Sequence, residues 1–300
     1  MSVHLGLDLG GTDVKCAVVA ADGSIVAEAR APNDAAKGED AVLARVVALG
    51  KATAAPHGPI ATAGLGLPGH ADFADGTGVL LPNLPGDWAG RPIAGPVSTG
   101  LGVPVRLVND ARAMTLAELR LGAARGVRDL VCVTLGTGVG GGVAIGGKLH
   151  LGLGHAGEIG HTTVAPDGPP CGCGNRGCLD RVASADAIAR DAGTASAAEA
   201  IAAARRGDPR AVDALAAAGR RVGLALAGAT VLLWPERIVV GGGVAAAGEL
   251  LLGPLREELY ARACVAPRID VLPAALGAGA GAIGAALWGA EGFHGAPPSG

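Results

Sequence analysis

The sequence predicts an α/β protein built from two lobes of related design. A strand, a glycine turn and a second strand follow one another at residues 3–20, and the same layout returns at residues 128–147. Segments with helical periodicity come after both of these starts, and strands that alternate with helices are typical of α/β folds. The boundary between the lobes is therefore expected near residue 115.

Length and composition agree with two globular lobes and exclude several classes of protein. The chain has 300 residues and a mass of 29.0 kDa, and half of its residues are hydrophobic, which is enough for a sizeable core. Aromatic residues make up only 2%, so this core has to be built from Ala, Val, Leu and Ile. A net charge of −3 without a basic stripe argues against nucleic acid as the main partner.

The sequence shows neither a secretory signal nor a membrane span, which favours the cytoplasm. Its start lacks a charged n-region and a long apolar h-region, and no run of eighteen strongly apolar residues occurs. Cys16, Cys132 and Cys264 lie singly in apolar surroundings and are expected to be buried thiols, as suits a reducing compartment.

The first half of the chain is expected to contain five strands and two helices. The strands are predicted at 3–10, 14–20, 24–30, 60–67 and 105–108, and the helices at 39–55 and 111–124. The Asp22-Gly23 pair is a strong hairpin signal. The stretch 70–100 is rich in Gly, Pro and Asp and is expected to be a functional loop.

The second half is expected to be dominated by Ala-rich helices. Helices are predicted at 184–192, 196–206, 208–230, 245–260 and 277–289, and further strands at 237–240 and 269–272. The tail after Glu291 is expected to fray.

A cluster of potential metal ligands stands near the middle of the chain. Cys171, Cys173 and Cys178 lie within eight residues, and His161 comes ten positions before the first of them. Thiolates and an imidazole at this range suit a tetrahedral Zn²⁺ site, which would be structural because four protein ligands close it. Disulfides are the alternative, although one of the three cysteines would stay unpaired. Alone, His161 would be interpreted as a hydrogen-bonded surface residue.

Glu158 lies three residues before His161, so in a helical segment the two side chains share a face. A metal on one imidazole nitrogen would fix the tautomer and leave the other nitrogen aimed at a ligand. The alternative for Glu158 is a solvated loop carboxylate.

Three glycine turns follow strands, at residues 10–12, 136–138 and 241–243. Glycines let backbone N–H groups converge on phosphate oxygens, and a Thr hydroxyl adds a donor. One such turn alone often only reverses the chain, but three of them favour nucleotide binding. Asp8 beside the first turn is a candidate to hold Mg²⁺ through water; its alternative is a carboxylate that caps the turn.

Asn109 and Asp110 stand where a strand ends and a helix opens, which is where α/β sheets present ligand-binding groups. In a phosphoryl transfer, Asp110 would take the proton from an attacking hydroxyl and Asn109 would orient the acceptor. An Asp that caps the helix is the alternative.

Together these motifs resemble the ROK family of sugar kinases and sugar-responsive repressors. The matching segments are DLGGT at 8–12, LGLPG at 65–69, NLPG at 83–86, VNDA at 108–111, TLGTGVGGG at 134–142, GHAGEIGH at 154–161 and CGCGNRGCLD at 171–180. The resemblance implies the actin-like, ribonuclease-H-like ATPase fold, with two lobes and an active site in the cleft between them. Residues 1–115 and a C-terminal helix at 277–290 would form one lobe, and residues 116–276 the lobe with the zinc site and dimer contacts.

The resemblance also implies ATP with Mg²⁺ as phosphate donor, a structural Zn²⁺, and a homodimer or homotetramer. Asp110 would be the catalytic base. The sugar contacts would be Gly69, Asn83, Asn109, Asp110, Glu158, His161 and Asp180. The nucleotide contacts would be Asp8, Gly10, Gly11, Thr12, Thr137, Gly138 and Gly242, and the zinc ligands His161, Cys171, Cys173 and Cys178.

Two positions depart from the pattern of the family. Asp180 stands where a Glu usually contacts the sugar, so the sugar shifts, a water fills the gap, or the preferred sugar differs. Asp13 stands where Lys or Asn commonly follows the Thr of the first motif, with Lys15 two residues further on. An extra carboxylate near phosphates is unfavourable unless it points away or helps with the metal.

The expected function is the ATP-dependent phosphorylation of a hexose, with glucose and its 6-hydroxyl first and a place in glycolysis. N-acetylmannosamine, fructose, mannose and allose remain open as acceptors. A sugar-sensing repressor is the second hypothesis; its relatives carry a helix-turn-helix, for which the strand that starts at Val3 is expected to leave no room. The third is an actin-like ATPase that acts on water, which has no use for Glu158 beside a zinc site.

Overall fold

The computed structural model describes residues 2–265 and 268–291, and these form two compact units. One unit comprises residues 1–121 together with the chain from Ala278 onward, and the other comprises Gly122–Gly277. The boundary expected near residue 115 falls inside helix α3 (Asp110–Arg120), so the division lies just past the end of this helix. The tail expected to fray after Glu291 lies outside the described residues.

The first unit is built on a five-stranded sheet. From edge to edge the order is β3-β2-β1-β4-β7, and the strands are β1 (Val3–Leu9), β2 (Asp13–Ala20), β3 (Ile25–Pro32), β4 (Ile60–Leu67) and β7 (Val105–Asn109). β1, β2 and β3 are antiparallel neighbours, whereas β1, β4 and β7 run parallel. The carboxyl ends of the three parallel strands therefore meet at one edge of the sheet.

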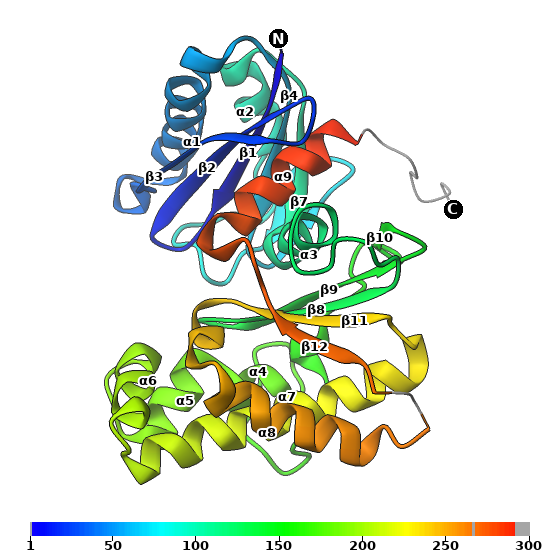
Figure 1. The fold of residues 1–300 in the computed structure, drawn as a ribbon. Coiled ribbons are helices and arrows are strands. Elements are labelled where there is room, and N and C mark those ends of the chain that lie inside the picture. Colours follow the sequence, from blue (N-terminus) through cyan, green and yellow to red (C-terminus); the bar gives the residue numbers. More distant parts are fainter. Residues whose placement is uncertain (1, 266–267, 292–300) are drawn as a thin grey trace. The chain divides into compact units, whose positions relative to one another are not determined.

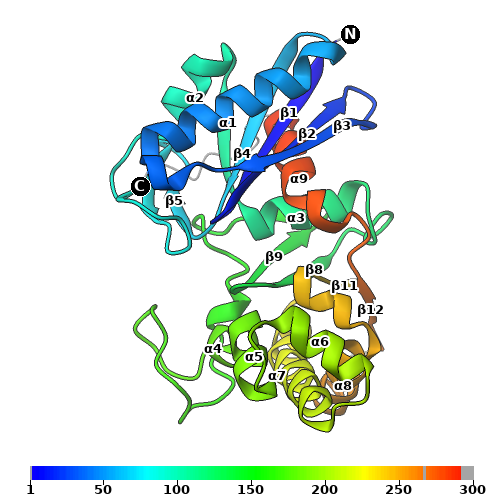
Figure 2. The same ribbon diagram turned by 90° about the vertical axis from the view of Figure 1, so that its left-hand side faces the viewer.

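Helices cover both faces of this sheet. Helices α1 (Glu39–Ala54) and α2 (Ala94–Leu101) lie on one face, and α3 and α9 (Ala280–Ala290) lie on the other (Figures 1 and 2). Small residues bring α9 against the strands, since a Cβ built at Gly6 would lie 1.8 Å from the carbonyl oxygen of Ala282. This close approach explains how a helix whose buried residues are all Ala or Gly apart from Ile283 packs on the strands.

The second unit repeats the design with a sheet of order β10-β9-β8-β11-β12. Its strands are β8 (Leu130–Leu135), β9 (Val139–Ile145), β10 (Lys148–His150), β11 (Arg237–Gly241) and β12 (Asp270–Pro273). The helices on one of its faces are α4 (Leu179–Ala183), α5 (Ala185–Ala192), α6 (Ala197–Arg205), α7 (Pro209–Leu233) and α8 (Glu249–Arg262) (Figures 1 and 2). Alternate residues of β8 (Val131, Val133 and Leu135) join the core beneath these helices, as the two-residue period of a strand requires.

Helix α7 has the length and apolar composition of a membrane span, although the sequence predicted none. It is the only such helix within the described ranges, and half of its most apolar window is buried in the protein. Its buried residues belong to the core of the second unit, and glycines on it contact α8: a Cβ at Gly219 would lie 2.4 Å from the carbonyl oxygen of Leu251. A core helix passes the same test, so this feature is weak evidence for a membrane span.

The structure corrects several expectations about single elements. The stretch 70–100 holds a hairpin of β5 (His70–Asp72) and β6 (Thr77–Leu80) as well as α2. Helix α2 buries Val97 and Leu101, but its glycines and proline hide the helical period. Residues Gly243–Ala247 form a 3₁₀ turn, so α8 starts later than predicted. Cys16 and Cys132 are buried, whereas Cys264 is exposed and was wrongly expected to be buried.

Candidate active site and metal centre

The four predicted metal ligands come together in the second unit. The ligand atoms of His161, Cys171, Cys173 and Cys178 all lie within 4.8 Å of one another. The Sγ atoms of Cys173 and Cys178 are 3.7 Å apart, and the same distance separates Cys171 Sγ from His161 Nδ1. Zn–S bonds of about 2.3 Å at tetrahedral angles place two thiolates about 3.8 Å apart, so the donor set fits one Zn²⁺. Each of these cysteines is a free thiol, which argues against the disulfide alternative.

Glycines and backbone hydrogen bonds shape the loop that carries the cysteines. Gly174 N–H donates to the carbonyl oxygen of Cys171 (3.0 Å), which closes a turn around the ligands. Gly177 has φ +61°, and a Cβ there would lie 1.5 Å from the carbonyl oxygen of Ala165, so only glycine fits. Cys178 then forms the N-cap of α4.

Burial acts on the thiol of Cys178 and makes metal binding depend on pH. Removal from water, followed by the neighbouring thiols of Cys173 and Cys171, raises the pKa of Cys178 to about 12 in the metal-free protein. A metal must therefore displace this proton when it binds the thiolate.

Glu158 and His161 lie at the two ends of a short 3₁₀ turn, Ile159–His161. The backbone N–H of His161 donates to the carbonyl oxygen of Glu158 at 3.1 Å, and in a 3₁₀ turn residues three apart stand on the same side. Glu158 itself is the N-cap that precedes this turn, so the shared face of the two side chains stays a prediction. Because Nδ1 of His161 faces the cysteines, Nε2 is the nitrogen that remains for another ligand.

The second and third glycine turns lie side by side at the carboxyl edge of the second sheet. Strands β8 and β11 are parallel neighbours, with Thr134 opposite Gly241. Gly242 has φ +84°, and a Cβ there would lie 2.3 Å from the carbonyl oxygen of Leu135. Two backbone turns with their N–H groups at one edge form a site that can bind an anion.

Asp180, the first departure from the pattern of the family, contacts the second glycine turn. Its Oδ1 accepts a hydrogen bond of 2.9 Å from the backbone N–H of Val139, the residue that follows the turn. A Cβ at Gly138 would lie 3.0 Å from the same oxygen. The sequence had suggested only a sugar contact for Asp180.

The first glycine turn closes β1 onto β2 and is held by residues nearby in the sequence. Gly10 N–H donates to the carbonyl oxygen of Asp13 (2.8 Å), and the Asn33 side-chain amide donates to the carbonyl oxygen of Gly10 (2.8 Å). Thr12 at the tip is exposed and donates its hydroxyl to Asp13 Oδ2 at 2.8 Å.

Asp13, the second departure, has a cationic partner that the sequence analysis missed. Arg30 on β3 lies 2.5 Å from Asp13 Oδ2, and its hydrogen bond is the main cause that lowers the pKa of Asp13. The hairpin register pairs Lys15 with Arg30, so the Asp22-Gly23 turn signal already placed Arg30 two residues from Asp13.

Asp8 is a buried carboxylate at the end of β1. Its pKa is raised because burial outweighs the opposing effect of Lys15, whose Nζ lies 3.5 Å away. The helix α9 comes close to it, since a Cβ at Gly281 would lie 2.6 Å from Asp8 Oδ2. A buried carboxylate whose one cationic partner is Lys15 offers oxygen atoms that could serve as ligands for a further cation.

The carboxyl ends of β4 and β7 bring further predicted residues together. Asn109 is the N-cap of α3, where its Oδ1 accepts the N–H groups of Ala111 and Arg112 while its Nδ2 donates to the carbonyl oxygen of Gly69 at 3.2 Å. The N-cap residue is thus Asn109, while Asp110, which the alternative gave as the cap, also accepts the N–H of Ala111 with its Oδ1 at 2.8 Å. Asp110 follows as the first, partly exposed residue of the helix.

Asn83 reaches this region by another contact. A Cβ at Gly11 would lie 2.5 Å from the carbonyl oxygen of Asn83, so the NLPG loop packs on the first glycine turn. The first unit therefore gathers Asp8, Gly10, Gly11, Thr12, Gly69, Asn83, Asn109 and Asp110 around one sheet edge. The second unit gathers Thr137, Gly138, Gly242, Glu158, His161, Asp180 and the cysteines.

Two α/β units, each beginning with a strand, a glycine turn and a second strand, define the class of actin-like ATPase folds. Residues 4–291 match the model of the ROK family, and the chain belongs to that family.

Named relatives cover almost the whole chain. The glucokinase of Streptomyces coelicolor is 34% identical over 95% of this chain and 97% of its own length. The structure of a ROK family glucokinase from Streptomyces griseus in complex with glucose and AMPPNP has a TM-score of 0.85 and 34% identity, and covers 97% of this chain and 100% of that one. An N-acetylmannosamine kinase of Escherichia fergusonii is 34% identical over 94% of this chain and 97% of its own length.

Proposed function

We propose that this protein is an ATP-dependent hexose kinase, with glucose as its first candidate substrate and the 6-hydroxyl as the acceptor. The observation that carries the proposal is Asp110, a partly exposed carboxylate at the carboxyl edge of the sheet whose first strand ends in a glycine turn. The relatives support it, because glucokinases match nearly the full length of the chain.

In this proposal Asp110 is the general base. Its carboxylate takes the proton from the attacking sugar hydroxyl while the new bond forms between that oxygen and the terminal phosphorus of ATP. The bond from this phosphorus to the bridging oxygen breaks, and ADP leaves. Gly69, Asn83, Asn109, Glu158 and His161 would orient the sugar. One N–H of the Asn109 side-chain amide donates to Gly69 and its Oδ1 caps α3, so the second amide N–H is the donor that would reach the sugar.

The glycine turns would bind the phosphates through backbone N–H groups and the hydroxyls of Thr12 and Thr137. Mg²⁺ neutralises charge on the phosphates when it is bound, and Asp8 would hold it through water. Asp13 is the extra carboxylate of the first turn. Its ion pair with Arg30 neutralises this negative charge, so Asp13 need not repel the phosphates of a nucleotide.

A coupled ADP-release assay tests the proposal. Glucose, N-acetylmannosamine, fructose, mannose and allose should be compared with ATP, and glucose also with inorganic polyphosphate as donor. We expect the highest kcat/KM with glucose and ATP. N-acetylmannosamine is the second candidate, because an N-acetylmannosamine kinase is 34% identical to this chain, the same identity as the Streptomyces coelicolor glucokinase. A higher kcat/KM with N-acetylmannosamine than with glucose would make it the preferred substrate. Sugar binding without ADP release on any sugar would favour a sensor.

The metal centre is proposed to hold one structural Zn²⁺. Elemental analysis should then find about one zinc per chain, and Cys173→Ser should lose it. The exposed Cys264 offers a matched control, since Cys264→Ser should keep the metal. Metal retained by Cys173→Ser would contradict the ligand set.

A homodimer or homotetramer in the cytoplasm is the proposed state of the protein. Light scattering behind a sizing column measures the mass in solution, and a mass of 29.0 kDa would contradict oligomerisation.

A further inference from the structure

The side chain of Asp180 bridges two parts of the second unit that lie 41 residues apart. It belongs to the first turn of α4, two residues after the ligand Cys178, and its Oδ1 accepts the N–H of Val139 at 2.9 Å. A Cβ at Gly138 would lie only 3.0 Å from this oxygen. The backbone of the second glycine turn therefore lies directly against the carboxylate.

The start of α5, which follows α4 after a single residue, holds the other side of the same turn. The N–H of Ala185, the first residue of α5, donates to the carbonyl oxygen of Gly136 at 2.8 Å. Within the turn, Gly136 N–H donates to the carbonyl oxygen of Gly138 at 2.9 Å. Helix α4 and the first residue of α5 thus hold the turn Gly136–Gly138 from its two ends, and the tip residue Thr137 is exposed.

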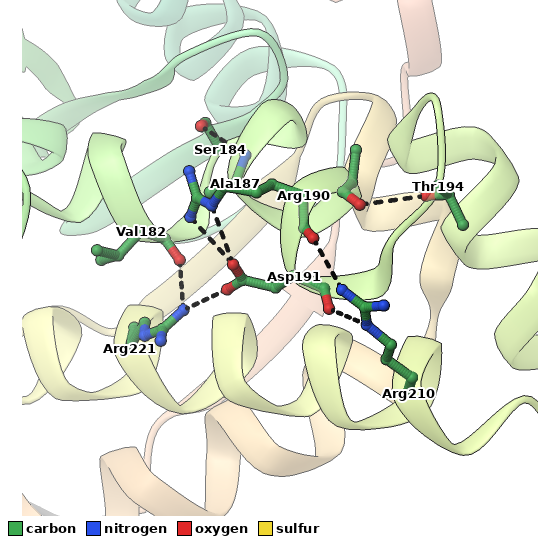
Figure 3. Close-up of polar contacts among 9 residues, drawn as sticks. Val182, Ser184, Ala187, Arg190, Asp191, Thr194, Arg210 and Arg221 are labelled. Carbon is green, nitrogen blue, oxygen red and sulfur yellow. Dashed lines mark hydrogen bonds and ion pairs between the residues drawn. The ribbon is translucent and has the colours of Figure 1, made fainter.

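Helix α4 is itself held at both ends. At its start, Cys178 is the N-cap, and Leu179 N–H donates to the carbonyl oxygen of Thr162, next to the ligand His161. At its end, Arg221 of α7 donates to the carbonyl oxygen of Val182 at 2.7 Å and pairs with Asp191 at 3.3 Å, as Figure 3 shows. The helix therefore moves only if the metal loop or α7 moves.

A second contact joins the metal ligands to the same turn. Gly160, next to His161, packs on β9, because a Cβ there would lie 1.9 Å from the carbonyl oxygen of Val139. Val139 thus has its N–H bound by Asp180 and its carbonyl oxygen covered by Gly160. The segment that carries His161 and the segment that carries Cys178 therefore both contact Val139, the residue that follows the turn.

We propose that Asp180 is a positioning residue for the nucleotide-binding turn Gly136–Gly138, and that α4 couples the metal centre to this turn. The inference rests on the proposed kinase function. It assigns Asp180 to the phosphate side of the site, whereas the resemblance implied a sugar contact at this position. A charge-assisted hydrogen bond to a backbone N–H is strong enough to hold a glycine turn in one conformation.

The test separates the KM for ATP from the KM for the sugar in holo-enzyme variants. Asp180→Ala removes the acceptor and should raise the KM for ATP about tenfold, the effect of one lost charge-assisted hydrogen bond, with the sugar KM within about twofold. Asp180→Asn keeps an acceptor oxygen and should restore most of the ATP affinity. Asp186→Ala changes an exposed carboxylate in the first turn of α5 and should match the wild type.

Asp180→Glu separates the two roles of this position and serves also if Asp180→Ala folds poorly. The extra methylene moves the carboxylate away from its present position at the N–H of Val139, so we expect a higher KM for ATP. If Asp180 instead contacts the sugar, Asp180→Glu should lower the sugar KM, and Asp180→Ala should raise it with an unchanged KM for ATP. Either result, or no change in both constants, would overturn the proposal.

Coupling to the metal is measured by nucleotide binding, which needs no sugar turnover. Calorimetric titration with AMPPNP should show a weaker Kd after zinc is removed from the wild type by a chelator, with zinc content measured in parallel. Zinc removal should change the Kd of Asp180→Ala little further, since coupled changes are not additive. Fully additive effects would refute the coupling. Nucleotide binding without turnover on any sugar would refute only the kinase function.

Discussion

The two strand–turn–strand hairpins look alike in the sequence but are stabilised in different ways. The hydrogen bonds that hold the turn between β1 and β2 join residues that lie between Gly10 and Asn33. The turn between β8 and β9 is held by Asp180 and Ala185, which lie more than forty residues further along the chain.

Each turn also has a carboxylate beside it, and the two carboxylates have different partners. Asp13 lies within the first hairpin and pairs with Arg30, an exposed side chain of the next strand. Asp180 comes from α4 and binds a backbone N–H instead of a cation. We therefore expect the first turn to tolerate changes in the charges around it better than the second, whose hydrogen bonds depend on the placement of α4 and α5.

The largest effect should come from the carboxyl edge that carries the first turn. Asp110→Asn removes the proposed base without changing the size of the side chain, and kcat with glucose should fall about 10³-fold, within the usual range for general base catalysis. ADP release at saturating ATP measures it, with AMPPNP binding as the control for folding. Full turnover by Asp110→Asn would show that Asp110 is not the general base.

The dependence of the second turn on packing can be tested at Gly242, a residue of the third turn that packs on Leu135, directly before the second turn. Gly242→Ala places a Cβ against the carbonyl oxygen of Leu135 at a positive φ, so we expect a loss of about 2 kcal/mol or more in the free energy of unfolding. That corresponds to a fall of roughly 5 °C in Tm, measurable by differential scanning fluorimetry. Gly243→Ala is the matched control, because a Cβ there meets nothing within 4 Å. Equal Tm values for the two variants would show that the close packing of Gly242 on Leu135 does not contribute to stability.

A smaller, pH-dependent effect is expected at Asp8, beside the first turn. Burial raises the pKa of Asp8 above its ordinary value of 3.8, so the folded protein keeps this proton at a pH where the unfolded chain has lost it. Ionisation of Asp8 therefore costs stability as the pH rises above 3.8, and the cost levels off above the raised pKa.

Asp8→Asn removes this titration. Its Tm relative to the wild type should rise between pH 4 and pH 7 and should equal the wild-type value at the acid end, while ADP release should fall if Asp8 holds Mg²⁺. Thermal melts across this pH range provide the measurement. A variant less stable than the wild type at pH 7 would show that the ion pair with Lys15 outweighs burial.

The smallest effect should come from Arg30. Arg30→Gln breaks an ion pair in which the Arg side chain is 66% exposed, and such pairs contribute less than about 1 kcal/mol. We expect a Tm within about 2 °C of the wild type and a Kd for AMPPNP that rises by no more than about threefold, because Asp13 loses its partner. Asp13→Asn should leave that Kd unchanged or lower it. A large loss of stability in Arg30→Gln would show that the first turn depends strongly on this one ion pair, and would contradict the small effect expected for it.

The sequence by itself determined the features that depend on neighbours along the chain. The hairpin at Asp22-Gly23, strand β4, the three glycine turns and the four clustered metal ligands were all predicted from local spacing. These features are set by backbone sterics and by short loops, which act over a few residues whatever the rest of the chain does.

Only the tertiary structure decided which distant groups meet. It made Asn109 the cap of α3, turned Gly95, Pro96 and Gly100 into part of a helix, and brought Asp180 to the N–H of Val139. Such contacts depend on which helix and strand faces pack together. This packing is decided across a whole unit and leaves no periodic pattern in the sequence.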